Sequence, residues 1–198
     1  QFVIPDFVNH MMENKMLGSK TGQGFYKMTK DAKGNRNILS LDLKTLEYRE
    51  KKSAKFATLE LTKKIDNVVD RFKVLVAGKD KAGEFYRKSF AAMFAYVQNR
   101  IPEISDEVYR IDDGLRAGFG WEHGPFQIWD AIGVAKGVEL MKAEGHEIAS
   151  WVTEMLAKGE TSFYSIKEGA THYYDIPTKS QVKKPGQDSF IILDNIRK

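Results

Sequence analysis

The sequence predicts a mainly α-helical fold in which a short β-hairpin ends each of two related segments. Through most of the chain, apolar residues recur every three or four positions, which is the spacing of one helix face. Alternating apolar and polar residues, which indicate strands, occur only in short segments. The chain shows no strand–helix–strand alternation, so its pattern does not predict a parallel nucleotide-binding sheet.

Two stretches of the chain resemble each other. The first is PDFVNHMMENKMLGSKTGQGFYKM (residues 5–28), and the second is ASWVTEMLAKGETSFYSIK (residues 149–167). Each has an aromatic–Val pair, then two long apolar residues, then a Phe–Tyr pair, and the second copy lacks the glycine loop. We expect residues 1–30 to be the tail of a first helical copy, 31–65 a hairpin and linker, and 66–198 a second, complete copy. This arrangement, and a first residue that is Gln, favour a piece of a longer protein.

The first part of the chain should contain one helix and one hairpin. Pro5–Leu17 has an apolar face and is followed by Gly18, which can end a helix with a positive φ. Residues 25–30 look extended, and Asn37–Glu50 alternates about a turn at 42–45.

Helices dominate the rest of the chain. The periodic segments lie near 65–76, 80–101, 104–115, 125–132, 134–144 and 147–158. Asp66 and Asp80 are candidate N-caps, and Gly78 is a candidate stop. Pro102 should end or kink the long helix, and Pro125 suits a first helical position. A second hairpin should follow, with strands at 163–167 and 171–176.

Residues 111–133 (IDDGLRAGFGWEHGPFQIWDAIG) form a glycine-rich corner between two helices. We expect its aromatic side chains to be buried, either in a packed helix–turn–helix or in the wall of an apolar ligand pocket; they are Phe119, Trp121, Phe126 and Trp129. Asp112 and Asp113 are expected at a solvated helix edge, because adjacent residues diverge on a helix. His123 is expected to be a surface or capping residue.

Composition excludes several classes of function. The chain has no Cys, and its four His are widely spaced, so neither a disulfide nor a metal site is expected. No apolar run is long enough to span a membrane. The net charge of +4 comes from scattered Lys and Arg, which argues against nucleic-acid binding. A reducing, cytoplasmic location fits this composition.

Several motifs in order resemble the C-terminal helical region of 3-hydroxyacyl-CoA dehydrogenases. They are Asn99–Arg100, a corner with Ile111-Asp112, Gly118, Gly120, Gly124-Pro125-Phe126, Asp130 and Gly133, and the segment LGSKTGQGFY at 17–26. A tandem helical copy with a degenerate tail is similar to the long, multifunctional members of fatty-acid β-oxidation. The resemblance implies NAD as cofactor, bound with a His–Glu pair on an N-terminal dinucleotide-binding domain that lies outside this sequence. The isolated chain should therefore be inactive.

The resemblance also implies candidate site residues. Asn99 matches the family's active-site Asn but lies in the second copy, so it is only a weak catalytic candidate. Lys20, Gly22 and Gly24 are weak candidates for contact with a 3-hydroxyacyl-CoA substrate. Here Lys20 precedes Gly22 and an extended segment follows, so the loop does not match a P-loop. The alternative is a non-catalytic structural or dimerisation module, in which an apolar patch of Phe7, Met11 and Met12 drives homo-oligomer formation.

Overall fold

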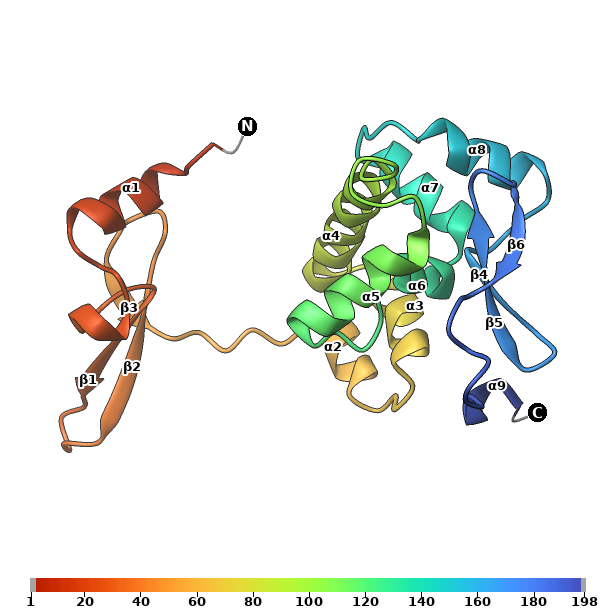
Figure 1. The fold of residues 1–198 in the computed structure, drawn as a ribbon. Helices are drawn as coiled ribbons and strands as arrows, with labels where there is room; N and C mark the ends of the chain where they lie inside the picture. Colours follow the sequence, from red (N-terminus) through yellow and green to blue (C-terminus); the bar gives the residue numbers. More distant parts are fainter. Residues whose placement is uncertain (1–2, 197–198) are drawn as a thin grey trace. The chain divides into compact units, whose positions relative to one another are not determined.

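The computed structural model describes residues 3–196, which fold as two compact units (Figure 1). Unit 1 extends to Ala54 and unit 2 begins at Lys55. Helices prevail, and each unit contains one three-stranded antiparallel sheet. The mainly α-helical class is therefore confirmed, whereas the division into copies at 1–30, 31–65 and 66–198 stays a prediction.

Unit 1 is a short helix followed by a small sheet. Its elements are α1 (Asp6–Glu13), the 3-10 turn η1 (Ser19–Thr21), β1 (Tyr26–Lys30), β2 (Arg36–Leu41) and β3 (Tyr48–Glu50), with the strand order β1-β2-β3. The hairpin at 37–50 is confirmed, but residues 26–30 also pair with it. The predicted helix ends early, since Lys15 has a φ of 53° and Met16 N–H donates to Met11 O at 2.8 Å.

The small core of unit 1 corrects the predicted apolar patch. Met11, Met16 and Leu41 are buried together, with Phe7 and Tyr48 packed against them. Met11 therefore faces the unit's own interior, and of the three patch residues only Met12 is exposed.

Unit 2 carries most of the helices. They are α2 (Ala57–Thr62), α3 (Val68–Ala77), α4 (Lys81–Gln98), α5 (Val108–Phe119), α6 (Pro125–Ile132), α7 (Val134–Ala143), α8 (Ser150–Ala157) and α9 (Leu193–Ile196). The strands β4 (Tyr164–Lys167), β5 (Ala170–Asp175) and β6 (Ser180–Lys183) form its sheet in that order. The predicted second hairpin is thus confirmed as β4–β5, and β6 is an additional strand.

Local signals set several helix ends. Asp80 accepts a hydrogen bond from Gly83 N–H and caps α4 as predicted, and Pro125 is the first residue of α6. The prediction of Asp66 as a cap was wrong by one residue, because Asn67 accepts the amides of Val69 and Asp70. Helix α5 ends at Gly120, whose φ is 66°. The long helix α4 ends at Gln98, ahead of Pro102.

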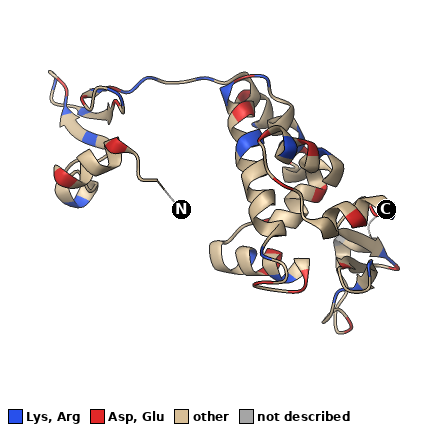
Figure 2. Ribbon diagram, turned by 90° about the horizontal axis from the view of Figure 1, so that it is seen from above, with Lys and Arg blue, Asp and Glu red and all other residues tan. Residues whose placement is uncertain are grey.

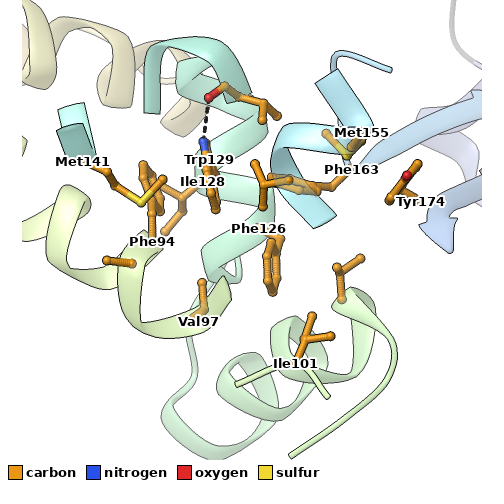
Figure 3. Close-up of a cluster of buried hydrophobic side chains, with 14 of the residues drawn as sticks. Phe94, Val97, Ile101, Phe126, Ile128, Trp129, Met141, Met155, Phe163 and Tyr174 are labelled. Atoms are coloured by element: carbon orange, nitrogen blue, oxygen red, sulfur yellow. Dashed lines mark hydrogen bonds between the residues drawn. The ribbon is translucent and has the colours of Figure 1, made fainter. Parts of the chain in front are cut away.

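The core of unit 2 is built around aromatic rings from α4, α6 and the segment before β4 (Figure 3). Phe94 stacks on Trp129 with ring centroids 4.8 Å apart, and Phe163 lies 5.0 Å from both Phe126 and Trp129. Figure 3 also shows the Trp129 indole donating to a backbone carbonyl, that of Val134.

The glycine-rich corner is only partly buried. Phe126 and Trp129, which lie on α6, are fully buried as predicted. Phe119 and Trp121 are exposed, which corrects the prediction for those two. They lie at the end of α5 and in the turn after it, where the chain runs over the surface.

Candidate functional site

The glycine loop at 18–24 of unit 1 is a compact turn that its own residues hold closed. Gly18 N–H donates to Gln23 O at 2.9 Å. The Thr21 hydroxyl accepts from Leu17 N–H at 3.0 Å and lies 3.1 Å from Gln23 O. A side chain at Gly24 would meet the Gly18 backbone at 2.8 Å, so only glycine fits there. Most of the motif is therefore explained by its turn.

Lys20 is the residue of this loop that the turn does not explain. It lies in η1, is exposed, and forms no ion pair with any residue of the described range. Beside it, Ser19, Gly22 and Gly24 line a hollow of about 440 Å³ with Phe25 and strands β1 and β2. Of the three predicted substrate residues, Gly22 and Gly24 line this hollow and Lys20 does not, and the role of all three stays a prediction.

Asn99 lies in unit 2, at the C-terminal end of α4. Its amide donates to Ala95 O at 2.8 Å, which is a helix-terminal contact. Asn99 borders a hollow of about 520 Å³ that Trp151 and Pro102 also line. The neighbouring Gln98 is buried and joins α4 to the start of α8 through Glu147 O and Ala149 N–H. No carboxylate or imidazole hydrogen-bonds to Asn99 within residues 3–196, so the geometry gives it no acid–base partner.

Sequence reasoning missed a pair of carboxylates that join three elements of unit 2. Asp112 on α5 accepts the amides of Phe126 at 2.9 Å and Gln127 at 3.0 Å, which are N-terminal donors of α6. The prediction of a solvated edge for Asp112 is therefore wrong, since it is 1% exposed. Its spacing of four from buried Val108 was the available signal, because such residues share a helix face.

Asp130, on α6, holds the start of β4 in the same way. Its two carboxylate oxygens accept the amides of Phe163 at 2.7 Å and Tyr164 at 2.8 Å. The Tyr164 hydroxyl donates to Asp112 at 2.8 Å, so the two carboxylates share one tyrosine. This network ties α5, α6 and β4 together.

Burial shifts the titration of both carboxylates. Burial raises the pKa of Asp112 to about 6, although the hydrogen bonds from Phe126, Tyr164 and Gln127 oppose this rise. Burial likewise raises the pKa of Asp130 to about 7, against the two amide hydrogen bonds and with a small contribution from the charge of Asp112. Every oxygen has a structural partner, so we interpret this pair as a clamp rather than an acid–base pair.

Other candidate chemistry is not assembled in the part of the chain that the structure describes. His123 is partly buried against the edge of Phe72, with ring centroids 6.0 Å apart. Within the described residues, no group of His, Asp and Glu could hold a metal ion, and no helix is long and apolar enough to cross a membrane. Figure 2 shows basic and acidic residues interspersed along the ribbon of both units.

Known proteins support the resemblance seen in the motifs. A probable 3-hydroxyacyl-CoA dehydrogenase of Bacillus subtilis (strain 168) is 38% identical over 174 residues, which are 88% of this chain and 21% of that protein. Putative fatty acid oxidation complex trifunctional enzymes of Rickettsia felis and Rickettsia prowazekii are 21% and 22% identical over 71% and 66% of the chain. The matches take up 19% and 16% of their own lengths.

The chain is thus homologous to a segment of these proteins, and the predicted resemblance to 3-hydroxyacyl-CoA dehydrogenases is confirmed. It spans about a fifth of the length of the curated relatives it matches. No family model matches the chain, and no solved structure matches it.

Proposed function

We propose that this chain supplies the C-terminal helical region of an NAD-dependent 3-hydroxyacyl-CoA dehydrogenase of fatty-acid β-oxidation. The observation that carries the proposal is the 38% identity to the Bacillus subtilis relative over 88% of the chain. The order of motifs along the chain agrees with it. We include a cytoplasmic location in this proposal.

In this proposal, NAD and the catalytic His–Glu pair belong to another domain of the longer enzyme. The two sheets within residues 3–196 are antiparallel, whereas dinucleotides bind at the carboxyl ends of parallel strands. The chain would provide walls for the acyl-CoA pocket and a packing surface for its neighbours. Asn99 would support the fold of the second copy rather than act on substrate.

Lys20 is the residue through which the chain would contact substrate directly. An exposed ammonium beside glycines whose backbone a ligand can approach closely suits the phosphates of coenzyme A. We would titrate a 3-oxoacyl-CoA into the chain calorimetrically, alongside Lys20→Ala and the matched control Lys33→Ala, which changes an exposed lysine between β1 and β2. Binding that Lys20→Ala alone weakens supports the proposal, and equal effects of both substitutions contradict it.

Activity of the isolated chain gives the second test. We expect no oxidation of NADH with a 3-oxoacyl-CoA, because hydride transfer needs the bound cofactor. Measurable turnover would contradict the proposal that NAD and the catalytic His–Glu pair belong to another domain.

A structural or dimerisation module remains the second candidate function. The exposed aromatic pair Phe25–Tyr26 favours it, since apolar groups that protrude together mark interaction surfaces. Sedimentation equilibrium distinguishes a dimerisation module from the first candidate function, because dimerisation predicts an apparent mass that rises with protein concentration.

A further inference from the structure

Unit 1 and the end of unit 2 are two copies of one structural motif. In each copy a helix, α1 or α8, leads into a three-stranded antiparallel sheet (Figure 1). The helices start alike, since Pro5 has φ −63° and ψ 148° and Ala149 has φ −60° and ψ 139°. The sequence repeat is therefore also a repeat of backbone geometry.

Hydrogen bonds and ring contacts fix which residues correspond. Leu41 N–H donates to Phe25 O at 2.9 Å, and Tyr174 N–H donates to Phe163 O at 2.7 Å. The preceding helix contributes an aromatic ring in both copies: the Phe7–Phe25 centroids lie 6.2 Å apart, and the Trp151–Phe163 centroids 5.9 Å apart. Phe25 thus corresponds to Phe163, and Tyr26 to Tyr164.

In unit 2 this Phe–Tyr edge is covered by helices. Asp130 accepts the amides of Phe163 and Tyr164, and Phe163 has no exposed surface. The following residues of the sheet, Ile166 and its cross-strand partner Thr171, border a hollow of about 480 Å³ that residues of α6 also line. A helix that carries a carboxylate is therefore the structural partner of this edge.

In unit 1 the same edge is open. Phe25 and Tyr26 are 51% and 61% exposed. No group within residues 3–196 accepts a hydrogen bond from the Phe25 amide. Met28 and its cross-strand partner Ile38 border the hollow of about 440 Å³, which only the glycine loop and the sheet line. The Phe–Tyr pair is therefore common to both units, whereas Tyr173, which packs against Tyr109 of α5, corresponds to the smaller Ser40 of unit 1.

We propose that the Phe25–Tyr26 edge docks against a protein helix bearing an aspartate that accepts the two amides, as Asp130 does in α6. The helix would come from polypeptide beyond the described residues, since the relatives extend far past the segment they share with this chain. An acceptor is needed because burying amide donors without one costs about 1–3 kcal/mol each. A single carboxylate supplies two acceptor oxygens, as Asp130 does for Phe163 and Tyr164. This docking follows from the internal repeat and is independent of the proposed function.

The test supplies this helix from the protein itself. Residues 55–148, which contain α2–α7, are fused directly before Pro5 of the chain, so that unit 1 takes the place of the missing α8–β6. Residues 5–54 occur once in this tandem protein. Peptides that contain Phe25 and Tyr26 therefore come from one copy only, and their hydrogen exchange measures whether this edge is covered. We expect these two amides to exchange about tenfold more slowly, or slower still, than in the unmodified chain. Asp130→Ala in the added copy alone should restore fast exchange.

A matched control keeps the aspartate occupied. When the added copy extends to residue 183, its own β4–β6 fills the position, and Phe25 and Tyr26 should exchange as fast as in the unmodified chain. Equal slowing in this control overturns the proposal. Unchanged exchange in the first tandem protein also overturns it, whether or not the added helices fold. Protection that grows with the concentration of the unmodified chain overturns it too, because a second copy would then cover the edge.

Discussion

The carboxylate of Asp130 accepts the Phe163 backbone amide at 2.7 Å, which fastens helix α6 to the first residue before β4, 33 positions further along the chain. The ring of the same Phe163 is buried between Phe126 and Trp129. One residue therefore links the sheet of unit 2 to its helical core by a polar and an apolar contact.

The first prediction concerns this hydrogen bond. In Asp130→Asn one acceptor oxygen becomes an NH₂ group, which cannot accept the amide that faces it. We expect the free energy of unfolding of unit 2 to fall by about 1–3 kcal/mol. Urea denaturation measures it, with the exposed Glu122→Gln as control. A change no larger than that of the control would show that the clamp adds nothing to stability.

The second prediction concerns pH. An Asp in an unfolded chain titrates near 3.9, whereas the pKa of Asp130 is raised to about 7 and that of Asp112 to about 6. Between these values the folded state holds protons that the unfolded state has lost, so proton binding favours folding. The contribution of this pair to stability is therefore present below about pH 4 and is lost as pH rises toward 7.

Urea denaturation between pH 5 and pH 8 tests this sign. Comparing the unmodified chain with Asp130→Asn cancels the pH dependence of stability that comes from titratable groups present in both proteins. We expect the stability of the unmodified chain to fall more steeply with rising pH than that of the variant. Parallel curves would contradict the raised pKa of Asp130.

Sequence reasoning succeeded where the signal is local. Asp80 and Pro125 act within one turn of their own helix, so the residue type alone indicates the boundary. The same applies to the Phe–Tyr pairs, whose place at the start of each sheet follows from the repeat. At Asp66 the prediction failed by one residue, because Asn67 caps equally well.

Tertiary contacts account for what sequence reasoning missed. Asp112 is buried because α6 starts against it and the Phe126 amide, 14 residues away, donates to its carboxylate. No residue near Asp112 in the sequence indicates this contact. Strand β6 was missed because its residues are mainly polar and are strand only through pairing with β5. Met11 is buried because the sheet of unit 1 folds back over α1.

The third prediction compares two helical glycines. A Cβ at Gly137 on α7 would lie 2.1 Å from the Trp129 indole nitrogen, whereas a Cβ at Gly114 on α5 would meet nothing within 4 Å. Gly137→Ala should therefore destabilise unit 2 by about 1–3 kcal/mol through overpacking. Gly114→Ala should stabilise it by about 0.5–1 kcal/mol, because alanine favours the helix.

Thermal unfolding of the two variants checks this pair. The shifts of the melting temperature should have opposite signs. Equal shifts would mean that helix propensity alone decides both positions and that α7 does not press on the indole.

The fourth prediction uses the two copies of the motif as each other's control. Phe163→Ala opens a cavity beside Phe126 and Trp129 and should cost about 3–5 kcal/mol. The corresponding Phe25→Ala removes a ring that is half exposed, so its cost in this chain should stay below about 1.5 kcal/mol. Urea denaturation monitored by hydrogen exchange of peptides from each unit assigns each loss of stability to its own unit. If Phe25→Ala cost as much as Phe163→Ala, the ring would already be packed against a partner, and the open edge of unit 1 would not exist in solution.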